Sequence, residues 1–138
     1  MTIIQISSPD VPEPSHRLFS NCLRVGDSVF LSGQHAGTDD GGLLGDGSMA
    51  SQTRETFRKI EALLNAAGSC MADVVKLTFY VTDLSLRKEA SLVRREFFTD
   101  PMPCSTLVGV SGLAAPNLLV EIDAVAVLGA SRREGERK

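Results

Sequence analysis

The sequence of 138 residues contains no tryptophan and one tyrosine, and it lacks an excess of basic residues, because 14 Lys and Arg stand against 17 Asp and Glu. Proteins that bind nucleic acids usually carry a basic patch or stripe, and they often hold single strands by stacking bases on aromatic rings. The net charge of −3 and the scarcity of large aromatic rings therefore argue against a dedicated nucleic-acid-binding protein.

Long apolar runs are also missing. The most apolar stretch, residues 118–128, contains two acidic residues, and it falls far short of the ~20 apolar residues that span a membrane. The first residues, MTIIQ, lack the basic start and the long apolar stretch of a secretory signal. We therefore expect no membrane association and a cytoplasmic location.

Cysteine is scarce and its number is odd, with Cys22, Cys70 and Cys104 far apart in the chain. This pattern is typical of reduced thiols in the cytosol rather than of a disulfide framework. The two histidines, His16 and His35, form no HxxxH or CxxC spacing with other ligands. We therefore expect neither a zinc site nor another cofactor.

What is present is the composition of one globular domain, with 43% hydrophobic and 22% charged residues. We place this domain at residues 1–130 and expect the charged segment 131–138 to be a disordered tail. Residues 1–18 contain three prolines, which disfavour helix, and they are predicted to form an extended arm.

Apolar periodicity in the remaining chain predicts the order ββαβαββ. A period of two, with Gly26-Asp27 as a hairpin turn, indicates strands, whereas a period of three to four indicates helices, the first of them ended by Gly68. Residues 37–47, rich in Gly and Asp, are predicted to form a loop. The predicted strands are residues 20–23, 28–34, 74–82, 105–110 and 118–128, and the predicted helices cover about residues 49–67 and 86–97.

Helices between strands can pack on one face of a single mixed sheet, so we predict a two-layer α+β domain. Strict alternation in residues 74–82 places Val75 with Leu77 and Phe79 on one face, and Val74 on the other. This strand and residues 118–128 are apolar on both faces, although the two helices can cover only one. Because a large exposed apolar face is normally an interface, we predict an obligate oligomer whose sheets pack together.

Six motifs, in order and at matching spacing, resemble the RidA family, also called YjgF or endoribonuclease L-PSP-like. The resemblance covers about residues 15–128, and its strongest piece is residues 29–34, VFLSGQ, which match a strand ending in Ser-Gly-Gln. The other matches are Gln52, residues 64–68 (LNAAG), residues 74–78 and 80–84 (VVKLT and YVTDL), Phe97 and Phe98 with Pro103, and residues 119–124 (LVEIDA).

The resemblance implies a fold similar to the small trimeric chorismate mutase, and a homotrimer with three pockets for a small molecule at the subunit boundaries. In the active deaminases of the family, a Ser-Gly pair, an upstream aromatic residue, an arginine and a glutamate line each pocket. The arginine holds the substrate carboxylate, and the glutamate positions the water that hydrolyses an enamine or imine to a keto acid and ammonia. This reaction requires proton transfer to and from water, which one oriented carboxylate can provide.

Three positions of this chain match that pocket. Ser32 and Gly33 match the Ser-Gly pair, and Glu121 matches the water-positioning glutamate and is the predicted catalytic residue. Alternation along the last strand places Glu121 on the face opposite Val120 and Ile122, toward a neighbouring subunit.

Other positions of the predicted substrate-binding pocket depart from the family. Phe19 stands where the family usually has tyrosine, and Ser91 stands where active deaminases commonly carry asparagine. The family's Pro-X-Arg-Ser/Thr reads PCST here, so Ser105 replaces the clamp arginine while Thr106 is retained. Leu107 replaces a cysteine that is often found two positions after the arginine.

A hydroxyl cannot replace a bidentate guanidinium, and the loss of a buried charge partner costs on the order of 2–5 kcal/mol of binding. We therefore expect 2-aminoacrylate to be a poor substrate and a larger or less charged one, such as an aminomuconate type, to fit better by family analogy. His16 or Arg17 in the arm are candidates for a replacement cation, although a surface role is the usual one for such an arm.

For several of these residues a structural role is the alternative. Glu121 could be an interface carboxylate, but we favour a function because an unpaired carboxylate in an apolar strand is costly. Asp123, on the same face, is interpreted as an interface or solvent-edge residue. Cys104 has no evident base partner, so packing is favoured over nucleophilic catalysis, and Arg94-Arg95 is interpreted as a solvated helix face.

Two functions stay open from the sequence. The first is a hydrolytic deaminase that acts on an enamine or imine. The second is a small-molecule-binding trimer of the same family that has lost turnover, which Ser105 makes credible. A role as ribonuclease or translation inhibitor fits poorly with the net charge of −3.

Overall fold

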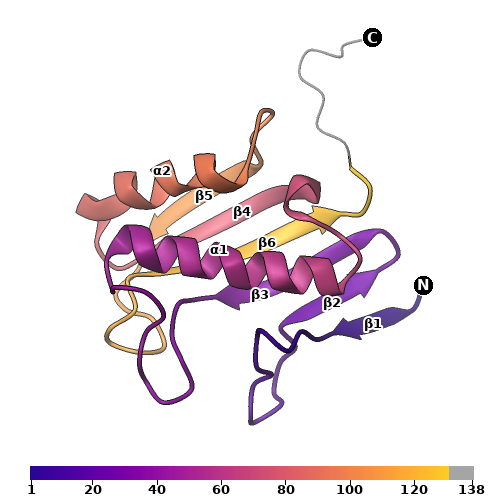
Figure 1. The fold of residues 1–138 in the computed structure, drawn as a ribbon, viewed down its shortest axis with the longest axis horizontal. Coiled ribbons are helices and arrows are strands. Elements are labelled where there is room, and N and C mark those ends of the chain that lie inside the picture. Colours follow the sequence, from indigo (N-terminus) through magenta and orange to yellow (C-terminus); the bar gives the residue numbers. More distant parts are fainter. Residues whose placement is uncertain (131–138) are drawn as a thin grey trace.

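In a computed structural model of the chain, which describes residues 1–130, one mixed six-stranded sheet carries two helices side by side on one face (Figure 1). The predicted two-layer α+β architecture is confirmed, and the predicted tail lies outside the described residues. The elements are β1 (Ile3–Ile6), β2 (Cys22–Val25), β3 (Ser28–Gln34), α1 (Met49–Ala66), β4 (Val74–Val81), α2 (Arg87–Phe97), β5 (Cys104–Gly109) and β6 (Val120–Val127).

The strands lie in the order β1-β2-β3-β6-β4-β5. All neighbours are antiparallel except β4 and β5, which are parallel and are joined by the crossover helix α2. The last strand, β6, pairs with β3 on one side and with β4 on the other. As a consequence, two strands separate β3 from β5, a distance of about 14 Å at ~4.8 Å per strand.

The N-terminal arm contains a strand that the sequence analysis did not separate from the rest of the arm. β1 pairs antiparallel with β2, with Ile3 opposite Val25 and Ile6 opposite Cys22. The three prolines follow this strand and so remove none of its hydrogen-bond donors. The observed order is therefore βββαβαββ, and the short apolar run before the first proline was the signal for the additional strand.

Helix α1 begins and ends as the sequence predicts. The Ser48 hydroxyl accepts a hydrogen bond from the Ser51 N–H at 3.1 Å, which caps the first turn. The helix stops where Gly68 adopts a left-handed φ of 81°, a conformation that glycine takes without a Cβ penalty.

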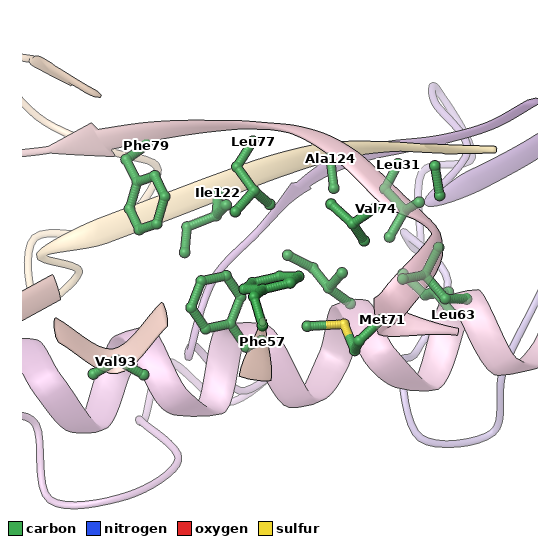
Figure 2. Close-up of a cluster of buried hydrophobic side chains, with 14 of the residues drawn as sticks. Leu31, Phe57, Leu63, Met71, Val74, Leu77, Phe79, Val93, Ile122 and Ala124 are labelled. Atoms are coloured by element: carbon green, nitrogen blue, oxygen red, sulfur yellow. The ribbon is translucent and has the colours of Figure 1, made fainter. Parts of the chain in front are cut away.

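The hydrophobic core fills the space between the helices and the sheet, where side chains of β3, β4 and β6 point toward α1 (Figure 2). Phe57 of α1 is fully buried and lies at its centre. Its ring centroid lies 5.9 Å from Phe79, 5.1 Å from Phe97 and 5.4 Å from Phe98. Burying one such side chain contributes about 1.5–3 kcal/mol, so this cluster fixes both helices on the sheet.

A β-bulge in β4 changes the predicted alternation. Val74 and Lys76 pair with the consecutive residues Ala126 and Val125, which leaves Val75 as an extra residue. Val74 is consequently buried with the core, whereas Val75 is 38% exposed. The predicted placement of these two valines was wrong, because a period-two pattern cannot reveal an inserted residue.

The sheet face opposite the helices carries a band of apolar side chains. Phe30 is 46% exposed, Val108 39% and Val127 37%, although all three lie within strands. Leu23 and Val125, which flank Phe30 in the sheet, are half-buried. We call this band the open face; it is the second apolar face that the sequence predicts.

Candidate functional site

The predicted Ser-Gly pair lies at a second β-bulge, in β3. Leu31 and Gln34 pair with Ala124 and Ile122 of β6, so three steps along β3 match two along β6. The extra residue belongs to the segment that contains the Ser-Gly pair, opposite Asp123. Bulges bend a strand and change the direction of its side chains, and they occur often beside functional sites.

Glu121 of β6 lies against this bulge, on the open face of the sheet. A Cβ atom at position 33 would lie 2.7 Å from Oε2 of Glu121 and 2.8 Å from its Cδ. Because Gly33 has no Cβ atom, it leaves the space for the carboxylate that the Cβ of any other residue would occupy. The resemblance to the RidA family implies that both residues line one pocket, and the structure places them in direct contact within one chain.

The Glu121 carboxylate is half-buried and has no hydrogen-bond or ion-pair partner among the described residues. Burial raises the pKa of Glu121 above its ordinary value, and the negative charge of Asp123 raises it further. Within residues 1–130, neither a hydrogen bond nor an ion pair stabilises the charged form of this carboxylate. Such a group exchanges a proton closer to neutral pH than an ordinary glutamate, as general acid–base catalysis requires.

Asp123 has a partner of its own. The Tyr80 hydroxyl donates a hydrogen bond to Oδ2 of Asp123 at 3.0 Å, across the β4–β6 pair. This bond to the carboxylate raises the pKa of Tyr80, and partial burial adds to the effect. The two carboxylates on this face thus differ, since Asp123 is held in place by Tyr80 and Glu121 is not held.

Ser32 has a structural bond that the sequence did not reveal. Its hydroxyl donates to the Ser20 carbonyl at 2.5 Å, and its N–H donates to the Asn21 carbonyl at 2.9 Å. These bonds tie the bulge to the segment before β2. The hydroxyl proton is therefore used within the chain, and only the oxygen lone pairs of Ser32 are left for a ligand.

A cleft of about 680 Å³ opens beside the bulge, between the N-terminal arm and the loop after β3. Phe19, Gly33 and His16 line it, and the Phe19 ring is 52% exposed and lies 5.3 Å from the His16 ring. His16, a candidate cation, therefore lies on the same side of the molecule as the bulge.

Two further side chains of this cleft were not predicted as site residues. His35 Nδ1 accepts a hydrogen bond from the Gly37 N–H at 3.0 Å, and burial followed by the charge of Lys59 lowers the pKa of His35. Lys59 Nζ donates to the Gly37 carbonyl at 2.9 Å. Lys59 comes from a helix face that reads as solvated, so the sequence held no signal for its place in the cleft.

The other predicted pocket residues lie elsewhere in the chain. Ser105 and Leu107 of β5 pair with Leu77 and Phe79, which places them on the helix-covered side of the sheet. Thr106 pairs with Thr78 and lies on the open face. The structure therefore does not bring Ser105 and Leu107 together with Glu121, which lies two strands away on the opposite face, or with the bulge, which lies three strands away.

Ser91 of α2 lines a second cleft, of about 660 Å³, formed by α2 and the segment that follows it. Arg94 also lines this cleft, with its guanidinium carbon 4.6 Å from the centroid of the Phe79 ring. The interpretation of Arg94 as a solvated residue was wrong, because it is half-buried and turned toward the sheet, whereas Arg95 is exposed.

The family-matched Gln52 has a structural role. It is fully buried, and its amide nitrogen donates to the carbonyls of Gly47 and Asn117 at 3.1 and 3.0 Å. Its amide oxygen accepts from the Leu119 N–H at 2.8 Å. This one side chain therefore fixes the loop before α1 to the segment that leads into β6 and Glu121.

Within residues 1–130, no three His, Cys, Asp or Glu side chains are arranged so that they could hold a metal ion. In the same residues, none of the helices combines the length and the apolar character that a membrane span needs.

Comparison with known proteins identifies the family of this chain. The sequence model of the family described as endoribonuclease L-PSP matches residues 10–128. The chain is 31% identical over 123 residues to the 2-iminobutanoate/2-iminopropanoate deaminase of Dermatophagoides farinae, covering 89% of this chain and 94% of that protein. It is 33% identical over 125 residues to a RutC family protein of Aquifex aeolicus, covering 89% and 98%.

Solved structures agree with this result. A protein of unknown function from Pseudomonas aeruginosa is similar with a TM-score of 0.85 and 35% identity, covering 94% of this chain and 95% of that one. A YjgF/YER057c/UK114 family member from Mycobacterium tuberculosis is similar with a TM-score of 0.79 and 35% identity, covering 92% and 100%. The chain therefore belongs to the endoribonuclease L-PSP family, the RidA/YjgF family whose motifs the sequence contains.

Proposed function

We propose that the protein is a hydrolytic deaminase that converts an enamine or imine into a carbonyl compound and ammonia. The observation that carries this proposal is the half-buried, unpartnered carboxylate of Glu121, which lies over Gly33 at the bulge of β3. The name of one relative, an iminobutanoate and iminopropanoate deaminase, supports the same class of reaction.

In the proposed reaction, Glu121 acts as the base and then as the acid. The carboxylate takes a proton from water while the water oxygen adds to the carbon of the C=N bond, and the nitrogen receives a proton. The resulting amino alcohol then loses ammonia and forms the C=O bond, so that imine and water give carbonyl compound and ammonia. The raised pKa of Glu121 suits it to both proton transfers near neutral pH.

We further propose that the active form is a homotrimer with its pockets between subunits. Glu121 and the bulge lie on one part of the chain, and Ser91, Ser105 and Leu107 lie on another, so one subunit does not assemble them. The open face, with Phe30 46% exposed, supplies an apolar surface for such contacts. A neighbouring copy could then bring the second set of residues to Glu121.

We propose a specificity that differs from that of relatives with the clamp arginine. Ser105 carries no charge and Phe19 has no hydroxyl, so these two positions offer a small acidic enamine neither a cation nor a hydroxyl. A larger or less charged substrate, such as an aminomuconate type, suits these replacements better. Ser105 also favours the second candidate, a non-catalytic trimer that binds a small molecule.

Ammonia release from freshly generated imines tests the proposal and separates the two candidates. The panel contains 2-aminoacrylate, 2-iminobutanoate and an aminomuconate-type enamine, each compared with its buffer hydrolysis rate. We expect weak or no acceleration with 2-aminoacrylate and clear acceleration with the larger compounds. Ligand binding without acceleration of any imine would refute the deaminase and support the binding protein.

A further inference from the structure

Arg94 of α2 has an environment that the fold alone does not account for. Its guanidinium carbon lies 4.6 Å from the centroid of the Phe79 ring, so the cation packs on an aromatic face inside the structure. Its Nε is buried and has no hydrogen-bond partner, and it is the one buried side-chain nitrogen or oxygen in residues 1–130 left in this condition. Buried donors of native proteins are almost always paired, so this donor calls for a partner.

The charge of Arg94 also has no ion-pair partner in the part of the chain that the structure describes. The two ion pairs within the described residues join Arg54 to Glu96 and Arg58 to Glu55, and neither includes Arg94. Glu96, two positions along the same helix, is held by two hydrogen bonds from Arg54, of 2.7 and 2.9 Å. A half-buried cation without an anion is costly, and an incoming anionic group would remove that cost.

A cleft gives such a group access to Arg94. The cleft of about 660 Å³ is lined by Arg94 and by Ser91, which precedes it by one helical turn and therefore lies on the same helix face. Thr99 adds a second hydroxyl at the rim, Arg95 adds an exposed cation and Asp100 adds an exposed carboxylate. The cleft therefore combines one half-buried cation with hydroxyl groups that can donate to the same ligand.

We infer that Arg94 binds a carboxylate of the ligand at this cleft and is a specificity-determining residue of the protein. The planar guanidinium suits a carboxylate, to which it can donate two parallel hydrogen bonds. Leu107 pairs with Phe79 across the two strands, and Ser105, two residues before Leu107, lies on the same face of the sheet. Because Arg94 packs on the Phe79 ring, it also lies on this face. Arg94 thus supplies the cation that Ser105 does not. The inference depends on the proposed function only for the identity of the ligand. It narrows the proposed substrates to imines or enamines of organic acids.

Calorimetric titration of the intact protein tests the inference without any turnover. The probes are 2-oxobutanoate and the larger 2-oxoadipate, with the neutral amide of 2-oxobutanoate for comparison. We expect the acids to bind and the amide to bind far more weakly. Arg94→Gln should weaken binding of the acids by roughly tenfold to a hundredfold, the range for a hydrogen bond to a charged group.

Arg87→Gln is the matched control, because it makes the same substitution at an exposed position of the same helix, outside the residues that line the cleft. It should leave the affinity for the acids unchanged. If Arg94→Gln does not fold, Arg94→Lys keeps a cation over Phe79 while it loses the bidentate donors, and it should weaken the same binding about tenfold. Unchanged affinity in the folded Arg94 variant, equal weakening in Arg87→Gln, or no binding of either acid to the wild type would each overturn the inference.

The test distinguishes this inference from the proposed function. Loss of acid binding in Arg94→Gln, together with no ammonia release from any imine, would support the Arg94 site and refute the deaminase. Ammonia release by the wild type, together with unchanged acid binding in Arg94→Gln, would support the deaminase and refute the Arg94 site.

Discussion

The carboxylate of Glu121 lies over the backbone of Gly33, so close that a Cβ atom at position 33 would be 2.7 Å from Oε2. This contact joins two strands that are adjacent in the sheet but far apart in the sequence. The extra residue in β3 between Leu31 and Gln34 creates the local geometry. Gly33 therefore acts as a positioning residue for Glu121, because it has no side chain that would displace the carboxylate.

Replacing Gly33→Ala should move the Glu121 carboxylate and lower turnover. The atoms in conflict belong to the end of a flexible side chain, so the fold should survive while the carboxylate shifts. A misplacement of about 1 Å can cost ~10²-fold in rate. Turnover of a substrate identified in the imine panel, and a thermal melt, measure the two effects.

Gly112→Ala is the control for this substitution, because a Cβ at Gly112 would have no atom of residues 1–130 within 4 Å. It should leave both rate and melting temperature unchanged. A Gly33→Ala protein that works at the wild-type rate would show that the contact with Glu121 has no role in catalysis.

The sequence predicted much of this region, but not its geometry. Alternation placed Glu121 on the uncovered face correctly, because β6 is regular over the residues around it. Alternation failed at Val75 and gave no reason for Gly33, because each lies at a bulge where one strand has an extra residue. A period-two pattern carries no mark of such an insertion, whose cause is tertiary.

Helix α2 shows the same limit for side chains. The apolar period of three to four predicted this helix, and its apolar stripe, with Ala90 and Val93, is buried against the core. The sequence did not show that Arg94, beside this stripe, packs on Phe79 instead of facing water. A long basic side chain can bury its stem and place its head in several directions, so burial of its charge depends on the neighbouring strand.

The open face should hold the subunits together. Phe30→Lys places a charge at the centre of this apolar band and should convert a trimer into smaller species at micromolar concentration, because burying an unpaired charge is costly. Light scattering coupled to size exclusion measures the mass. Ala66→Lys adds the same charge on the exposed surface of α1 and should leave the mass unchanged. A monomeric wild type would contradict the trimer and the shared pocket.

The stability of the protein should depend on the ionisation of Glu121. Its folded-state pKa is raised by burial and by Asp123, so the stability that its protonated form provides is complete below the usual glutamate pKa of about 4.3. That stability is lost as the pH rises through the raised pKa of the folded state. Glu121→Gln should therefore be more stable than the wild type at neutral pH, with a difference that disappears under acidic conditions.

Melting temperatures of both proteins between acidic and neutral pH measure this difference. Asp123→Asn provides a second comparison, because it removes one cause of the raised pKa of Glu121 and leaves an amide oxygen that can accept from Tyr80. It should shift the pH range of the transition downward. A Glu121→Gln protein that is less stable at neutral pH would indicate that another subunit pairs with the carboxylate.

Glu121→Gln should also remove most of the catalytic activity while it preserves assembly and ligand affinity. Glutamine has nearly the same shape, so the contact over Gly33 remains, but its amide cannot take the proton of the attacking water. We expect turnover to fall by ~10²-fold or more, the usual range for a general acid or base. Steady-state rates with the identified substrate, together with the mass from light scattering, give the result. A carboxylate that served only the interface would show the opposite pattern, with altered mass or stability and nearly intact turnover. The catalytic assignment is wrong if the Gln variant turns over the substrate at the wild-type rate.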